Sequence, residues 1–252
     1  LDGHDQFKFL ESNEFSPISY FVEPIAISLN FIDKNFDYTN YHMLGISGGG
    51  WTTVIYPAID QRISHAMSVA GSIPIELRTL PRDYGDYEQR LPDLYRIASY
   101  HDLYVLASFG TDKKLEQVFD WNDKCCFAAK DIDTSYQDEI KNRLAGLGSD
   151  GFEIGFTKNP GGVHNISGMS LMGFYLYILN EKDRQDFFDQ EQRKQTNDWS
   201  GVKITGITWD YRDLSNGDFT GTTFSNTNFS NSNFSNSNFF STDIDSVNFK
   251  NT

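Results

Sequence analysis

The C-terminal part of the chain has a five-residue period that neither an α-helix nor a β-strand accommodates. From residue 199 onward a large apolar residue occupies every fifth position: Trp199, Ile204, Trp209, Leu214, Phe219, Phe224, Phe229, Phe234, Phe239, Ile244 and Phe249. Most of them follow a small residue by two positions, as Phe224 follows Thr222. Helices repeat about every 3.6 residues and strands about every 2, so the period indicates a square coil with one group of residues on each face.

These residues resemble the pentapeptide-repeat proteins, which implies a right-handed quadrilateral β-solenoid over residues 197–252. The alternative is a disordered tail rich in Asn and Ser. Regularly spaced Phe argues against it, because disordered tails are poor in aromatic residues. Arg212 stands where other repeats have a small residue, so the first coil is expected to be irregular. The repeat has no catalytic pattern, and we expect a module for binding a protein partner or for self-association.

A second constraint is the stretch HMLGISGGGWTT at residues 42–53. A strand-like run enters a Gly-x-Ser-x-Gly motif centred on Ser47, and a segment able to form a helix follows. In such a motif the serine lies at a sharp strand-to-helix turn, with its hydroxyl exposed at the helix N-terminus. Gly45 and Gly49 are expected because a side chain at either position would collide with a neighbouring strand or helix. The alternative is an ordinary glycine-rich turn.

The remainder of the first 180 residues alternates between helix-like and strand-like patterns, which predicts an α/β fold with a mostly parallel sheet. We expect helices at about 20–35, 51–60, 135–147 and 167–180, and strands before Ser47 and at 62–71, 115–119 and 152–156. Residues 72–112 are long for a crossover, and two interpretations stay open: an inserted lid, or a helical crossover with an irregular start. The predicted domains are 1–180 and 197–252, joined by a charged, Gln-rich linker at 181–196.

One histidine has a position that suits a general base. His164 lies in a glycine-rich loop between the last predicted strand and a helix, whereas His42 precedes the serine turn and is expected to be structural. An acid that orients His164 is expected just after the strand that precedes the last helix–strand pair, which is the predicted strand 115–119. Asp123 fits best, Asp120 is second and Asp112 third. The alternative for each of them is a solvated turn residue.

These motifs together resemble the α/β-hydrolases, and in particular a bacterial esterase-like branch. The resemblance rests on residues 45–53, 68–72 and 122–127 and on the His164 loop. It implies that Ser47 is the nucleophile, His164 the general base and Asp123 the orienting acid. It also implies that the Gly48 N–H is one oxyanion donor. The implied substrate is a small carboxylic ester that forms an acyl-enzyme on Ser47, and no cofactor is implied.

The chain departs from that family before the serine turn. An α/β-hydrolase normally has several strands there, and one of them carries the second oxyanion donor, but only 46 residues precede Ser47. We therefore expect the second half of the fold. A rival function also stays open, in which the chain is a catalytically incomplete hydrolase remnant that carries a protein-interaction module.

Charge and cysteine content restrict the partners. The net charge of −14 argues against nucleic acid and anionic membrane, both of which need a basic surface. Cys125 and Cys126 are adjacent, so they form no disulfide framework, and without further Cys or clustered His they lack the spacing of a metal site. The most apolar run, residues 166–179, is too short to span a bilayer. No feature of the sequence indicates a compartment.

Overall fold

The computed structural model describes residues 3–179, 183–184 and 197–252, and the chain divides into two compact units, Leu1–Ile166 and Ser167–Thr252. Most of the linker expected at 181–196 lies outside the described residues. Within the described part of the chain, no helix combines the length and the apolar character that crossing a membrane requires.

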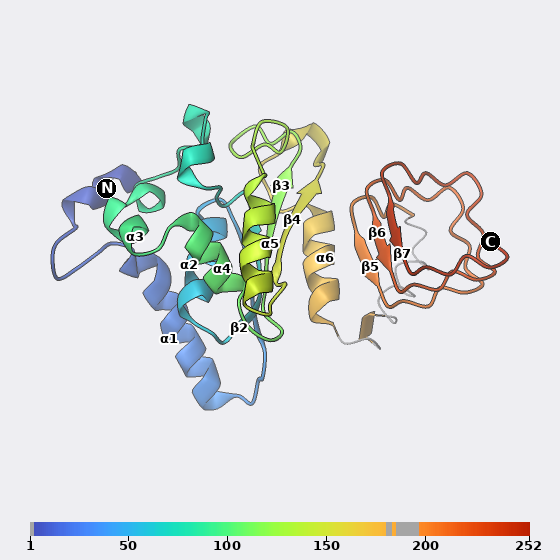
Figure 1. Cartoon of the computed structure of the whole chain (residues 1–252), viewed down its shortest axis with the longest axis horizontal. Coiled ribbons are helices and arrows are strands. Elements are labelled where there is room, and N and C mark those ends of the chain that lie inside the picture. Colours follow the sequence, from blue (N-terminus) through green and yellow to red (C-terminus); the bar gives the residue numbers. More distant parts are fainter. Residues whose placement is uncertain (1–2, 180–182, 185–196) are drawn as a thin grey trace. The chain divides into compact units, whose positions relative to one another are not determined.

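The first unit is built on a parallel sheet with the strand order β1-β2-β3-β4, which confirms the expected α/β class (Figure 1). Its strands are β1 (Tyr41–Ile46), β2 (Ile63–Val69), β3 (Lys114–Asp120) and β4 (Phe152–Thr157). The register aligns Gly45 with Ser68, Ser68 with Gln117, and Gln117 with Ile154. The two inner strands are almost entirely buried, as is typical of parallel strands that are covered on both faces.

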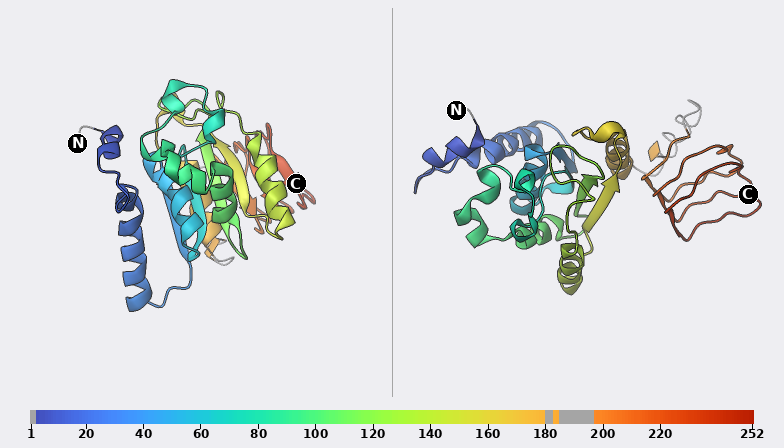
Figure 2. Two further views of the ribbon diagram at one scale, coloured as in Figure 1. Left: turned by 60° about the vertical axis from the view of Figure 1, so that its left-hand side comes forward. Right: turned by 90° about the horizontal axis from the view of Figure 1, so that it is seen from above.

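Three helices connect these strands: α2 (Gly48–Ile59), α4 (Tyr100–Ser108) and α5 (Tyr136–Gly146). Parallel crossovers are right-handed and successive strands are neighbours here, so the three helices lie on the same face of the sheet (Figure 2). Trp51 and Tyr104 from this layer are fully buried. The helix α1 (Ser19–Asn35) precedes the sheet, and Phe21 from it packs edge-on against Trp51.

The segment between β2 and β3 is an irregular run that leads into the crossover helix α4. The short helix α3 (Pro92–Ile97) also lies in this segment. The irregular part is organised around Arg78, which is 6% exposed. Its guanidinium lies over the Tyr100 ring at 4.8 Å and donates to the Ile73 carbonyl oxygen at 3.0 Å. A helical crossover with an irregular start describes this arrangement. The 3-10 helices among the described residues of the unit are η1 (His4–Phe9), η2 (Ile75–Leu77), η3 (Pro81–Asp83), η4 (Glu88–Arg90) and η5 (Pro160–Gly162).

The second unit contains the repeat, whose strands pair in parallel at an offset of 20 residues. The strands β5 (Lys203–Thr205), β6 (Thr223–Ser225) and β7 (Asp243–Asp245) align Ile204 with Phe224 and Ile244. Four five-residue sides make one such coil, so the register is compatible with the expected solenoid. The bridges from Asp198 to Asp218 and from Asp213 to Asn233 keep the same offset. The first coil is therefore regular, and the expected irregularity at Arg212 is wrong.

The apolar residues of successive coils stack on one another. Phe219 lies on Phe239 with ring centroids 5.0 Å apart, and Phe229 lies on Phe249 at 5.4 Å. Phe219 and Phe229 are fully buried, but Phe239 and Phe249 are only partly buried, and Ile244 is 48% exposed. The five-residue period predicts that six rings are all buried: Phe219, Phe224, Phe229, Phe234, Phe239 and Phe249. This prediction is wrong for Phe234, Phe239 and Phe249, which are only partly buried. Among the described residues these three rings have a stacked coil on one side only.

Two further features explain the composition of the repeat. Hydroxyls at the small-residue position donate to carbonyl oxygens one coil earlier, as Thr222 does to Trp199 (2.6 Å) and Thr242 does to Phe219 (2.8 Å). The corners have positive φ at every fifth residue: Gly201, Gly206, Tyr211, Asn216, Gly221, Asn226, Asn231, Asn236, Ser241, Ser246 and Asn251. Gly and Asn tolerate this left-handed conformation best, which accounts for the many Asn.

The helix α6 (Gly168–Ile178) contacts the repeat. Leu176 is buried in the same apolar cluster as Trp199. Arg184 donates to the carbonyl oxygens of Leu176 (3.0 Å) and Thr205 (3.1 Å), and so connects the end of α6 to β5. The predicted first domain, 1–180, includes this helix, whereas its contacts place it in the second unit.

Candidate active site

Ser47 lies at the turn between β1 and α2. Its backbone has φ 56° and ψ −123°, a left-handed conformation that is rare for a residue with a side chain. The Ser47 N–H donates to the Val69 carbonyl oxygen at 3.0 Å, which attaches the turn to β2. Gly48 is the first residue of α2, so its N–H has no acceptor within the helix. This N–H therefore lies at the N-terminus of α2 beside Ser47, where helix N–H groups can bind negative charge.

Close backbone approaches around this turn require glycine, but not at both expected positions. A Cβ on Gly45 would lie 2.3 Å from the Gly49 carbonyl oxygen, whereas a Cβ on Gly49 would meet nothing within 4 Å. The expected collision at Gly49 is therefore wrong, because this residue contributes its carbonyl to the approach. A second approach joins α2 to the end of β2, where a Cβ on Gly71 would lie 2.3 Å from the Gly50 carbonyl carbon. Sequence reasoning did not identify this second pair.

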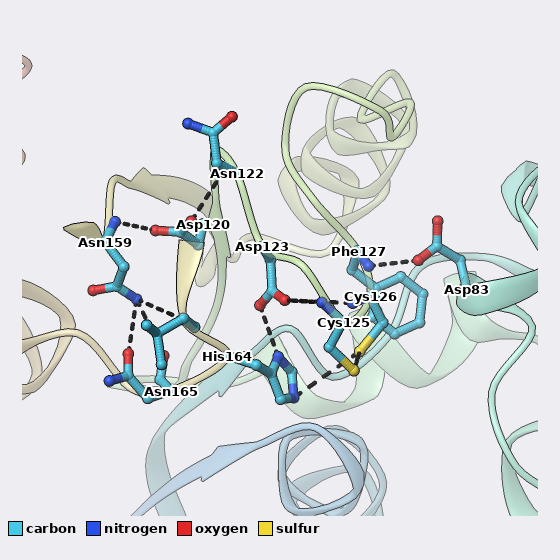
Figure 3. A network of polar contacts seen from close by, with 11 residues as sticks. Asp83, Asp120, Asn122, Asp123, Cys125, Cys126, Phe127, Asn159, His164 and Asn165 are labelled. Carbon is cyan, nitrogen blue, oxygen red and sulfur yellow. Dashed lines mark hydrogen bonds and ion pairs between the residues drawn. The ribbon is translucent and has the colours of Figure 1, made fainter. Parts of the chain in front are cut away.

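Asp123 and His164 are hydrogen-bonded (Figure 3). His164 Nδ1 lies 2.7 Å from Asp123 Oδ2, and the other carboxylate oxygen accepts the Cys125 N–H at 2.7 Å. Asp123 is 3% exposed. The two hydrogen bonds hold its carboxylate in place. A carboxylate accepts only, so Nδ1 of His164 carries the proton and Nε2 presents a lone pair.

The two rival acids have other positions. Asp120 accepts the N–H groups of Asn122 (3.0 Å) and Asn159, and so joins the loops that follow β3 and β4. Asp112 precedes β3 and is exposed at the opposite end of that strand. Neither carboxylate contacts His164 among the described residues. Sequence reasoning missed Asn159, whose side chain donates to Asn165 Oδ1 at 2.9 Å within the histidine loop.

A glycine allows the acid loop and the histidine loop to meet. Gly162 has φ 65°, and a Cβ on it would lie 2.2 Å from the Asn122 carbonyl oxygen. The Gly162 carbonyl accepts the Lys124 N–H at 3.2 Å. This contact holds the two loops at the spacing that the Asp123–His164 hydrogen bond needs.

The second ring nitrogen of His164 faces sulfur. Its Nε2 lies 4.0 Å from Cys126 Sγ, which in turn lies 2.8 Å from Cys125 Sγ. Burial, together with the neighbouring Cys125, raises the pKa of the Cys126 thiol, so this thiol is protonated at neutral pH. In the part of the chain that the structure describes, His164 and Ser47 make no hydrogen bond with each other.

The charge around the acid loop differs from the charge of the chain as a whole. A cleft of about 620 Å³ lies beside this loop. Four of its nine lining residues are cationic, namely Arg82, Lys124, Lys130 and Lys158. Arg82 is paired with Asp131, and the three lysines leave a local excess of positive charge in a chain of net charge −14. On the strands, burial lowers the pKa of His42 and His65, which suits neutral structural histidines.

Comparison with known proteins adds one family match. The model of pentapeptide repeats matches residues 213–252 in eight copies. No curated protein matches the chain. The chain is similar in structure to an acylaminoacyl peptidase from Pyrococcus horikoshii, with 16% identity, a TM-score of 0.40, and coverage of 69% of this chain and 27% of the peptidase.

Two further similar structures are a putative dienelactone hydrolase and an esterase. The first, from Klebsiella pneumoniae, has 12% identity and a TM-score of 0.35, with 68% of this chain and 57% of that chain covered. The second, a CE15 esterase from a marine bacterial metagenome, has 14% identity and a TM-score of 0.41, with 58% and 43% covered.

The chain therefore spans between 27% and 57% of these three structures. At such TM-scores these matches carry no argument. The assignment of the first unit rests on its own parallel sheet and strained serine turn. The first unit resembles the α/β-hydrolases in its parallel sheet and in its serine turn, and residues 213–252 match the pentapeptide repeats.

Proposed function

We propose that the chain is a serine hydrolase that cleaves a carboxylic ester through an acyl-enzyme on Ser47. The observation that carries the proposal is the 2.7 Å contact between Asp123 and His164. Ser47, Asp123 and His164 follow β1, β3 and β4 respectively. Because the carboxyl ends of parallel strands meet at one edge of a sheet, all three residues belong to the same edge.

In this mechanism the Ser47 hydroxyl attacks the ester carbonyl carbon and His164 Nε2 accepts its proton. Asp123 holds the Nδ1–H tautomer and stabilises the imidazolium that forms. The Gly48 N–H donates to the oxyanion of the tetrahedral intermediate. Collapse of this intermediate releases the alcohol, which takes the proton from His164. A water molecule, deprotonated by the same histidine, then hydrolyses the acyl-enzyme.

One observation favours a second candidate function. His164 Nε2 lies against Cys126 and makes no hydrogen bond to Ser47 within the described residues. In that reading the first unit is a catalytically incomplete remnant, and the chain acts through protein binding by its repeat. Under either function we propose that the repeat is a module for binding a partner or for self-association. Its stacked coils, with their exposed Asn side chains, would be the binding surface.

A fluorophosphonate probe separates the two functions, because it reacts covalently with an activated serine. We expect the parent chain to be labelled and Ser47→Ala to lose the label. Ser28→Ala, at an exposed serine of α1, is the control and should keep it. Labelling of Ser47→Ala would contradict the assignment of the nucleophile. A parent chain that takes no label would contradict the hydrolase proposal and favour the remnant.

A further inference from the structure

The loop after β3 and the loop after β4 gather three metal-ligating atoms at one point. Cys125 Sγ, Cys126 Sγ and His164 Nε2 all lie within 4.8 Å of one another (Figure 3). The cysteines are adjacent, and the histidine comes from 38 residues further along the chain. In the sequence, the adjacent thiols have no further ligand at the spacing of a metal site. The fold supplies that ligand.

The histidine is prepared for a cation. Asp123 accepts a hydrogen bond from the Nδ1–H, which leaves the Nε2 lone pair on the side of the two sulfurs. A carboxylate behind the imidazole is the usual support of a metal-bound histidine, because it fixes the tautomer and raises the basicity of the ring. The Asp123 carboxylate also accepts the Cys125 N–H. The same carboxylate therefore contacts both the imidazole of His164 and the backbone of Cys125.

The donor set selects soft or borderline ions. Two thiolates and one imidazole suit Zn²⁺ or Cd²⁺, and with three protein ligands a fourth position stays open to water. Binding displaces one proton from each thiol. The sulfurs are 2.8 Å apart, and tetrahedral coordination needs them about 1 Å farther apart, given Zn–S bonds of about 2.3 Å. Cys125 is exposed, so its side chain is free to rotate outward, and it provides the entry path.

We propose that Cys125, Cys126 and His164 form a site for a thiophilic divalent cation, and that the bound ion inhibits ester hydrolysis by occupying the lone pair of the base. The inhibitory part rests on the function proposed above, whereas the binding part does not. An ion on Nε2 removes the acceptor for the Ser47 proton. Hydrolysis then depends on the free concentration of the ion.

Cd²⁺ titration of the reduced full chain tests the site, because thiolate–cadmium bonds give an ultraviolet charge-transfer absorption. We expect the band to saturate at one equivalent and to disappear in Cys125→Ser and Cys126→Ser. Asp123→Asn should keep the band but bind about 10- to 100-fold more weakly, the usual cost of losing the partner of a metal-bound histidine. Circular dichroism should show that each variant is folded.

Two controls separate this site from others. His4, Asp86 and Glu88 form a second cluster of possible ligands that has no thiol, so His4→Gln should leave the cadmium band unchanged. Ser47→Ala should also leave it unchanged, because the serine is not a ligand. A band that survives in both cysteine variants, or no band in the parent chain, overturns the proposal.

The activity measurement is kept separate from binding. In the parent chain Zn²⁺ should inhibit ester hydrolysis at least tenfold, and a chelator should restore it. The residual activity of Cys125→Ser should be the same with and without Zn²⁺. Zn²⁺ inhibition that persists in Cys125→Ser overturns the inhibitory role of the site. A cadmium band in a chain that hydrolyses no ester supports the site and contradicts the proposed function instead.

Discussion

In the first unit, positive φ occurs at isolated non-glycine residues, Ser47, Ala70, Asp112 and Phe127, whereas in the repeat it recurs at every fifth residue. Most of the repeat corners are Gly or Asn, the residues that adopt this conformation at the least cost. Ser47 has no such advantage. The periodic positive φ of the repeat therefore follows from its architecture, whereas the isolated positive φ of Ser47, between a strand and a helix, supports the proposal of a functional role.

The hydrogen bonds of the two units differ in the same way. The polar contacts of the histidine loop are individual contacts, such as Asp123 to His164 and Asn159 to Asn165, and they do not recur at a fixed spacing. In the repeat, one contact is copied along the chain, from Thr222 to Trp199 and from Ser237 to Leu214. A substitution of one of these residues in the first unit should therefore have a large effect on the activity that depends on it. Substitutions in the repeat should have effects graded by position in the stack.

The largest expected effect is on the orienting acid. Asp123→Asn should reduce the turnover of an ester substrate by about 10⁴-fold, because the amide no longer holds the Nδ1–H tautomer of His164. The measurement is steady-state kinetics with a chromogenic ester. Asp112→Asn, at the far end of β3, is the matched control and should retain full turnover. Equal losses of turnover in the two variants would contradict the assignment of Asp123 as the acid that orients His164.

Next in size is a cavity in the repeat. Phe229→Ala should cost about 3–5 kcal/mol, because this ring is fully buried between Phe224, Phe234 and Phe249. Phe249→Ala should cost less, since its ring is only partly buried. Thermal melts with limited proteolysis measure both variants. If the two losses are equal, the effects are not graded by stacking.

A smaller effect is expected from overpacking beside the serine turn. Gly71→Ala should destabilise the first unit by about 1–3 kcal/mol, because the new methyl would meet the Gly50 backbone. Gly49→Ala should change stability little, since a Cβ there meets nothing within 4 Å. Chemical denaturation of both variants tests the pair. A destabilised Gly49→Ala would restore the original expectation from the motif.

The smallest effect concerns a corner of the repeat. Tyr211 has φ 58° and is 77% exposed, so its side chain gains little packing for the strained backbone. Tyr211→Asn should stabilise the second unit by about 1 kcal/mol. Asn226→Ala, at an equivalent corner, should destabilise it by a similar amount. Denaturation midpoints with opposite shifts are expected, and shifts of the same sign would contradict the role assigned to the corners.

Patterns that are local in the sequence predicted most of the elements. The apolar periodicity of residues 20–35 predicted α1, and the short apolar runs predicted all four strands of the sheet. The order of the motifs along the chain predicted the serine turn at Ser47 and the contact between Asp123 and His164. The contribution of His164 to a site with Cys125 and Cys126 could not be predicted, because it depends on how two loops meet in space. The membership of α6 in the second unit depends equally on tertiary contacts.

Glycine spacing shows the same limit. The motif predicted the close approach at Gly45. The approach between Gly50 and Gly71 joins a helix to the end of a strand, and only the folded sheet brings these two together. In the repeat, the period predicted the apolar stack, while the corner role of the Asn residues required backbone angles. The handedness of the coil remains a prediction.

The 20-residue offset between paired strands has a consequence for how such a tail changes length during evolution. Each coil presents the next with the same row of backbone groups and the same hydroxyl-to-carbonyl contact. A duplication or deletion of one whole coil therefore restores every pairing, whereas a change of one or two residues displaces every aromatic ring and corner that follows it. Gene segments that encode complete coils are thus interchangeable units, and the length of the tail can vary between relatives in whole steps without any new interaction.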